Sequence, residues 1–371
     1  MAKNTDSIPF TELVERTQEL ARERADVKSK VRGIVNDVYT REIPRKEDWS
    51  FFLVSSAMTL IEQYATGTVT ANTGATTLTF SSDVVITSSM VGRKVKITGN
   101  DYVYEITAMS GATGATIRPP LSGDQNVTSV SYAIFQNLYA LPSDFDRYPK
   151  NGGLVNYLGG QEVVIPEKPY QEWADEANYT PVNDPEFCRI IGVNTAGNAL
   201  IEVNPPPKIA KSLKNDYLIR PRAMRETTIG LIGSIAASGT AVVGDGNTRF
   251  TEATTGDWFR INSFGKGSDS EWYRILAISG NSGLTLQTAF GLSGATSAGY
   301  TISSVPQMPA RMHPSILYGT LTQLAADQND PLYQGYNLKL AEVLSDGKRI
   351  YKTRNYQQDI HHLGEDYLYR R

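Results

Sequence analysis

The chain has 371 residues, a length that predicts two or three compact units at roughly 150 residues per domain. Lys and Arg total 36 against 39 Asp and Glu, and the resulting net charge of -3 argues against a protein that wraps duplex DNA. The single cysteine, Cys188, excludes an intrachain disulfide and zinc sites built on cysteine pairs. No apolar run reaches about 18 residues and the N-terminus lacks a signal-peptide pattern, so we expect a soluble protein made in the cytoplasm.

The N-terminal region is rich in charge and has helical periodicity. Thr11 is the expected N-cap of a helix over residues 11–40, because acidic residues follow it and apolar residues then recur every three or four positions. Pro44 ends this pattern. Apolar residues between Trp49 and Tyr64 predict a second helix over residues 47–65.

An internal repeat is the most informative feature of the sequence. The stretch that begins at Tyr104 and ends at Gly111 corresponds to the stretch from Tyr273 to Gly280, and shorter matches flank both. Each copy is about 70 residues long, with alternating apolar positions and glycine-rich turns. We expect each copy to be a small β-barrel or β-sandwich of five or six strands.

The remaining segments predict a hairpin and two helices. Residues 187–193 and 199–203 flank a five-residue turn and predict a β-hairpin, and residues 216–220 predict a third strand. Pro314 opens an expected helix that Asp330 and Pro331 end, and a further helix is expected over residues 332–344. Residues 348–371 have little apolar periodicity and predict an extended tail.

These elements together predict an α+β fold, in which a helical framework with a β-hairpin sheet carries two inserted small β-barrel or β-sandwich modules. The expected boundaries are residues 1–65 for the N-terminal helices and 66–136 for the first module. Residues 137–229 form the central hairpin region, 230–304 the second module, 305–347 the C-terminal helices and 348–371 the tail.

Residues with chemical potential are scattered, and the sequence predicts no catalytic, metal or cofactor site. The spacing of His361, His362, Glu365 and Asp366 matches no metalloprotease motif. His313 precedes an expected helix start, and Cys188 lies in an expected strand with no histidine near it in sequence. The glycine-rich residues 244–247 lack the Lys-Ser/Thr pair of a phosphate loop, and the acidic pairs Asp144/Asp146 and Asp175/Glu176 have no defined catalytic separation.

The C-terminal segment is the candidate binding element. Its basic residues alternate with tyrosines, whose apolar body and polar tip suit protein interfaces. The bases could meet phosphates or an acidic protein groove, and the interleaved aromatic residues favour docking to a protein. The candidate docking residues are Lys348, Arg349, Tyr351, Lys352, Arg354, Tyr356, Tyr367, Tyr369, Arg370 and Arg371.

The order of several segments resembles a known family. Leu141–Arg147 follows the first repeat, a hairpin ends in Pro205–Pro207, a strand covers Tyr217–Pro221, and His313–Leu321 opens a helix. This order, with an N-terminal helical pair leading to Trp49, resembles the head–tail adaptor (connector or neck) proteins of tailed bacteriophages. The repeat itself resembles a β module that recurs in phage structural proteins.

The resemblance implies a structural virion protein rather than an enzyme. Such a protein forms a ring, commonly of twelve copies, between the portal and the tail, and genomic double-stranded DNA passes through its channel without sequence-specific binding. The implied partners are the portal protein, a downstream neck or tail protein and further copies of the chain. The implied location is the virion neck, after synthesis in the cytoplasm of the bacterial host. By position, residues 348–371 dock on the portal, and helices 11–40, 47–65 and 314–344 form the ring.

Two alternatives remain open at the level of sequence. The β modules could serve a phage tail fibre or a host- or glycan-binding virion protein, although such fibres usually place their modules in series. A virion hydrolase is the other alternative, and no constellation in the sequence favours it.

Overall fold

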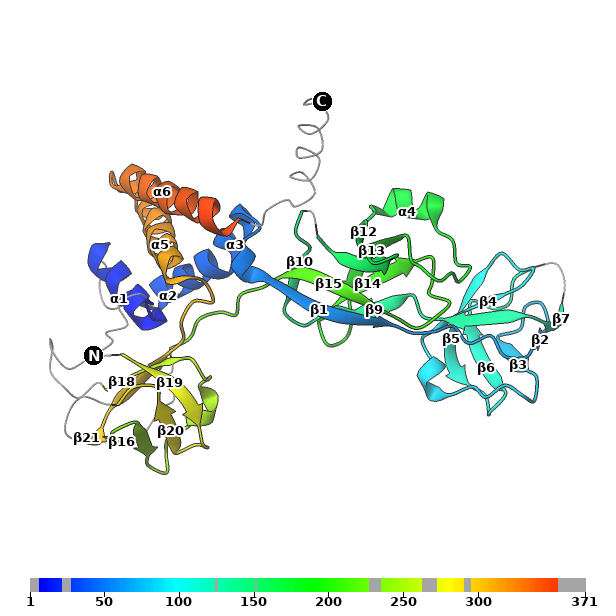
Figure 1. Ribbon diagram of the computed structural model, residues 1–371, viewed down its shortest axis with the longest axis horizontal. Coiled ribbons are helices and arrows are strands. Elements are labelled where there is room, and N and C mark those ends of the chain that lie inside the picture. Colours follow the sequence, from blue (N-terminus) through cyan, green and yellow to red (C-terminus); the bar gives the residue numbers. More distant parts are fainter. Residues whose placement is uncertain are drawn as a thin grey trace, which may run out of the picture. The chain divides into compact units, whose positions relative to one another are not determined.

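The chain is mostly antiparallel β-structure. The computed structural model describes residues 7–21, 28–123, 126–150, 152–226, 235–261, 272–289 and 295–352. Strands make up 35% of the structure and helices 27%, and the strands form several curled antiparallel sheets (Figure 1). The expected α+β fold built on a helical framework is therefore wrong.

The chain divides into two compact units. One unit contains Met1–Phe52 together with Arg220–Arg371, and the other contains Leu53–Ile219. Each unit contains one copy of the repeat, and the units are described separately below.

Helices in the first unit pack around a shared apolar core. Leu13 and Val14, Val31 and Val35, and Ile316 and Leu321 are all fully buried, at the spacing of amphipathic helices. Asn329 adopts a left-handed conformation that ends one helix, and the Asp330 side chain then accepts a hydrogen bond from the Leu332 backbone N–H (2.8 Å). The helices are α1 (Phe10–Leu20), α2 (Lys28–Asp37), a π-helical turn (Val38–Glu42), α3 (Ile43–Lys46), α5 (His313–Gln328) and α6 (Tyr333–Tyr351).

The N-terminal helical region differs in detail from the expectation. Pro9, not Thr11, is the N-cap residue of α1, and the Thr11 backbone N–H instead donates to Ser303 Oγ (3.0 Å). Helical backbone also continues past Pro44, because this proline lies in the first turn of α3, where its missing N–H has no helical partner to lose.

The expected helix over residues 47–65 is wrong. Ser50–Phe52 form a 3-10 turn, and Leu53–Leu60 form strand β1, which pairs along its whole length with β15 (Lys211–Ile219). Val54, Ser55 and Ser56 have modest helix propensity, so a long antiparallel ladder outweighs the local preference.

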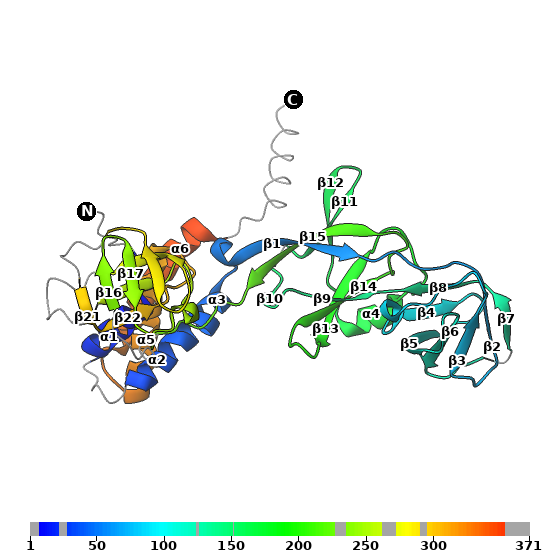
Figure 2. The same ribbon diagram turned by 90° about the horizontal axis from the view of Figure 1, so that it is seen from below.

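The second unit holds two central sheets beside its β module. The larger has the order β1-β15-β11-β12, with β10 also paired to β15, and the smaller has the order β13-β14-β9. The expected hairpin is confirmed as β13 and β14, and Figure 2 shows β11 and β12 as a second hairpin. The bounds are β9 (Leu138–Ala140), β10 (Phe145–Arg147), β11 (Leu154–Leu158), β12 (Gln161–Ile165), β13 (Phe187–Val193), β14 (Ala199–Asn204) and the short helix α4 (Tyr170–Glu176).

The internal repeat is confirmed by the topology of the two modules, although each has seven strands rather than the expected five or six. Their strand orders, β7-β2-β3-β6-β5-β4-β8 and β21-β16-β17-β20-β19-β18-β22, are the same when the strands are matched in sequence order. The first module contains β2 (Val69–Ala71), β3 (Thr77–Phe80), β4 (Lys94–Ile97), β5 (Val103–Met109), β6 (Gly114–Arg118), β7 (Val127–Val130) and β8 (Tyr132–Phe135). The second contains β16 (Ile235–Ser238), β17 (Ala241–Gly244), β18 (Trp258–Ile261), β19 (Tyr273–Ile278), β20 (Gly283–Leu286), β21 (Ala295–Ala298) and β22 (Tyr300–Ser303).

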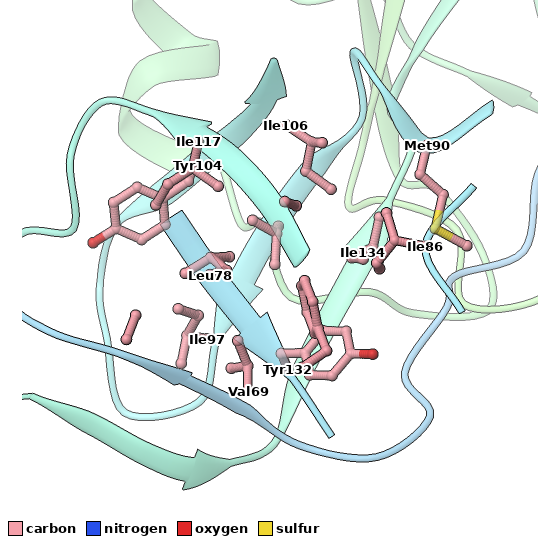
Figure 3. Packing of buried hydrophobic residues seen from close by; sticks show 14 of the residues in the cluster. Val69, Leu78, Ile86, Met90, Ile97, Tyr104, Ile106, Ile117, Tyr132 and Ile134 are labelled. Atoms are coloured by element: carbon pink, nitrogen blue, oxygen red, sulfur yellow. The ribbon is translucent and has the colours of Figure 1, made fainter. Parts of the chain in front are cut away.

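Each module closes on itself through its last two strands. In the first module only Ser131 separates β7 from β8, yet β7 pairs with β2 and β8 pairs with β4, at opposite ends of the sheet. One bent strand therefore joins both edges, which removes the exposed edges that an open sheet would present. Figure 3 shows the enclosed core, in which Leu78, Ile97 and Ile134 are fully buried.

One turn illustrates how closely the two copies correspond. Gly111 and Gly280 occupy equivalent positions and have φ values of 87° and 108°, a region that favours glycine. In both turns a serine backbone N–H donates to a glycine carbonyl at 2.9 Å, Ser110 to Gly114 and Ser279 to Gly283. The sequence match at this turn thus reflects the same backbone requirement in both modules.

Candidate docking segment

The C-terminal segment begins within the last turns of α6. Lys348, Arg349 and Tyr351 belong to this helix, and Lys352 follows as its C-cap residue. The remaining candidate docking residues, Arg354, Tyr356, Tyr367, Tyr369, Arg370 and Arg371, lie outside the described residues.

Charged contacts connect the start of this segment to the N-terminal region. Lys348 Nζ lies 3.4 Å from one carboxylate oxygen of Glu47, and Lys352 Nζ lies 3.5 Å from the other. Lys352 also forms an isolated antiparallel bridge with Trp49. Because both lysine side chains are about half exposed, these ion pairs set geometry more than stability.

Aromatic packing provides the apolar part of this connection. Trp49 is fully buried, and its indole N–H donates to the Ile43 carbonyl at 2.8 Å. The Phe51 ring packs edge-on against Tyr351, with centroids 5.7 Å apart. A Cβ atom at Gly347 would clash with the Met312 thioether and lie 3.3 Å from the Trp49 ring, so the close packing of α6 here requires a glycine at position 347. We call the contact of residues 47–51 with residues 347–352 the tail anchor.

The outer side of α6 is exposed in the described part of the chain. Gly347 is the buried residue of this helix, whereas Leu338 is 72% exposed and Ile350 is 49% exposed. One side of α6 therefore packs on α5 and on residues 47–51, and the other side is exposed.

His313 has a structural environment. Its ring is fully buried, Nδ1 accepts a hydrogen bond from the Ile8 backbone N–H (2.9 Å), and Nε2 lies 3.2 Å from the Met308 carbonyl. These two partners assign the proton to Nε2 of a neutral imidazole. Burial lowers the pKa of His313 to about 4, so the ring stays neutral at physiological pH.

Cys188 is equally unsuited to nucleophilic chemistry. The thiol is buried in the core beside the Ile165 carbonyl, and desolvation, with a smaller contribution from the nearby Glu167 carboxylate, raises its pKa to about 12. The reactive thiolate is therefore almost absent at neutral pH.

The other chemically interesting residues have local partners or lie outside the described residues. Asp144 accepts a hydrogen bond from the Tyr217 hydroxyl (3.0 Å), and Asp245 in the glycine-rich turn accepts one from the Asn247 backbone N–H (2.9 Å). Glu176 forms an ion pair with Lys168. His361, His362, Glu365 and Asp366 fall outside the described part, within which no group of three or more His, Cys, Asp or Glu residues could hold a metal ion.

The expected extended tail over residues 348–371 is wrong at its start, because α6 continues to Tyr351. The sequence also predicts none of the residues that contact this start. The helix expected over residues 47–65 includes Glu47, Trp49 and Phe51, although three aromatic residues within positions 49–52 are a signal for a packing point. Within the described residues, no helix combines the length and apolarity that crossing a membrane requires.

Comparison with models of known protein families and with curated proteins found no match to this chain.

Proposed function

We propose that this protein is a head–tail adaptor of a tailed bacteriophage, a structural virion protein that forms a ring between the portal and the tail. Its mechanism is packing rather than catalysis. In this proposal genomic DNA passes through the ring channel, residues 348–371 dock on the portal, and the opposite face receives the next neck or tail protein.

The tail anchor is the observation that carries this proposal. Residues 348–352 at the end of α6 are positioned by ion pairs with Glu47 and by the packing of Phe51 on Tyr351. Residue 352, the last described residue, therefore has a defined position on the helical region. A segment whose sequence is rich in tyrosine and arginine suits docking into a groove of a partner, because such residues are favoured at interface centres.

The contacts of each β module with the rest of its own unit also support a structural role. In the first module, Lys94 on the outer side of β4 contacts Glu202 (3.0 Å). In the second, Arg260 on the outer side of the equivalent strand β18 contacts Glu15 of α1 (3.3 Å). Both modules thus contact the rest of their own unit through the equivalent strand, which is consistent with two copies of one structural module.

A truncation tests this proposal. The chain ending at Lys352 keeps the whole tail anchor, so it should fold like the full-length chain. We expect it to lose binding to the portal ring in native mass spectrometry and co-sedimentation, whereas the full-length chain binds. Undiminished binding of the folded, truncated chain would contradict the docking assignment.

A matched variant separates the anchor from the tail. Glu47→Gln leaves every tail residue in place and removes the charge that Lys348 and Lys352 face. We expect it to weaken portal binding less than the truncation does, since the exposed ion pairs contribute about 0–1 kcal/mol each.

A further inference from the structure

A cavity of about 600 Å³ lies in the first unit, between the second β module and the two segments that flank it in sequence, one following β15 and the other leading to α5. Its lining includes the arginines Arg222 and Arg225 from the first connecting segment and Arg274 from β19. Thr254, from the turn before β18, and Ser304, from the second connecting segment, add hydroxyl groups. Three exposed arginines from two separate segments therefore line one concave space.

The charges in this cavity are unbalanced. Asp257 is its carboxylate, and this side chain accepts a hydrogen bond from the Thr254 backbone N–H at 2.8 Å. Arg225 reaches Thr254 Oγ1 at 3.5 Å, whereas among the described residues Arg222 and Arg274 form no ion pair. With Asp257 ionised, the lining carries a net charge of about +2, which suits a divalent anion.

The first module shows that this arrangement is not a general property of the repeat. Arg274 on β19 lies opposite Trp258 on β18 in the strand register. The equivalent position in the first module is Glu105 on β5, which lies opposite Lys94 on β4. An acidic residue thus stands where the second module has an arginine. The arginine cluster is therefore a feature of this copy and of the segments that connect it.

We propose that this cavity binds a small phosphoryl anion. Guanidinium groups match the several acceptor oxygens of a phosphoryl group with bidentate hydrogen bonds, and the Thr254 hydroxyl supplies a further donor. A cavity of this volume fits a small ligand. A DNA duplex instead needs an extended basic face for its convex row of phosphates. This inference does not depend on the adaptor proposal.

Titration calorimetry with inorganic pyrophosphate tests the site on the full-length chain at low ionic strength. We expect one binding site per chain, with a change in tryptophan fluorescence because Trp258 also lines the cavity. The double variant Arg222→Gln/Arg274→Gln should bind at least about tenfold more weakly, since each guanidinium supplies charge-assisted hydrogen bonds. Arg274→Glu, which introduces the acidic residue of the first module, should weaken binding further.

Arg118→Gln is the matched control. This arginine lies on the first module, where its exposed side chain pairs with Glu105 at 3.3 Å, and its replacement should leave pyrophosphate binding unchanged. Circular dichroism confirms that each variant is folded. Absence of binding to the folded full-length chain, or equal binding by the double variant, would overturn the proposal.

Two further ligands distinguish the source of the phosphoryl group. A short single-stranded oligonucleotide that competes with pyrophosphate supports the site and assigns it to a nucleic-acid phosphate. Lack of such competition, with pyrophosphate bound, supports the site and assigns it to a free polyphosphate. Tighter binding of a tetraglutamate peptide than of pyrophosphate would overturn the phosphoryl assignment in favour of a carboxylate ligand.

Discussion

Arg189 and Glu202 face each other across strands β13 and β14, and the Arg189 guanidinium donates two hydrogen bonds to Glu202 Oε2, at 3.0 and 2.7 Å. The other carboxylate oxygen accepts hydrogen bonds from Lys94 Nζ (3.0 Å) and Asn137 Nδ2 (2.6 Å). The Glu202 side chain is only 2% exposed. One buried carboxylate therefore joins the small central sheet to the first β module.

Replacement of Glu202 by Gln should destabilise the second unit. It leaves the Arg189 and Lys94 charges without their counter-ion, and breaking a largely buried pair in this way costs about 2–4 kcal/mol. Urea unfolding followed by circular dichroism measures the change. Glu105→Gln is the control, because its pair with Arg118 is exposed and contributes less than about 1 kcal/mol. If both variants lose a similar amount of unfolding free energy, the buried Glu202 cluster stabilises the protein no more than the exposed Arg118–Glu105 pair does.

Gly319 sets the distance between α5 and the π-helical turn. A Cβ atom at this position would lie 2.6 Å from Val38 Cγ1, and the branched valine side chain has little freedom to move away. We expect Gly319→Ala to destabilise the protein by about 1–3 kcal/mol through overpacking. Gly335→Ala in α6 meets no atom within 4 Å and should stabilise the protein by up to about 1 kcal/mol. A stabilising Gly319→Ala would contradict the packing at this contact.

Stability should fall with acidification because of His313. Its pKa is about 4 in the folded protein against 6.5 for an exposed histidine, so between these values the unfolded chain binds the additional proton. His313 therefore does not lower the free energy of unfolding above about pH 6.5. As the pH falls from 6.5 toward 4, it lowers this free energy by about 3 kcal/mol in total. Urea unfolding at several pH values should show a weaker pH dependence in His313→Gln than in the unmodified chain.

The other two histidines provide a control for that experiment. His361→Gln/His362→Gln leaves the buried ring intact and should keep the full pH dependence. If the His313→Gln and unmodified chains have parallel stability profiles between pH 4 and 6.5, the neutral, buried state of His313 is refuted.

Cys188 should resist alkylation in the native protein. A pKa of about 12 in place of 9 lowers the thiolate fraction at pH 8 about a thousandfold, and burial blocks access as well. Mass spectrometry after iodoacetamide treatment should find Cys188 unmodified in buffer and fully modified in urea. Rapid modification in buffer would reopen a nucleophilic role for this residue.

Local signals predicted some elements well. Pro314 and the Asp330-Pro331 pair enclose a helix expected from residue 314, and α5 covers His313–Gln328. The turn between Val193 and Ala199 marked the hairpin of β13 and β14. The repeat was readable because both copies need the same turn glycines and the same alternating core positions.

Non-local contacts explain what the sequence could not predict. β1 has apolar residues compatible with either helical or extended spacing, and its partner β15 lies far along the chain. Glu47 and Trp49 meet Lys348, Gly347 and Lys352 only through the tertiary fold. Neither the mostly β character of the chain nor the tail anchor is encoded in a short stretch of sequence.

Negative-stain electron microscopy of this protein, mixed with the portal protein that the adaptor proposal names as its partner, tests the proposal most directly. The proposal predicts a second ring that caps the narrow end of the portal with the full-length chain and is absent with the chain ending at Lys352. Portal rings without added density, under conditions where both proteins are folded, would contradict the adaptor function.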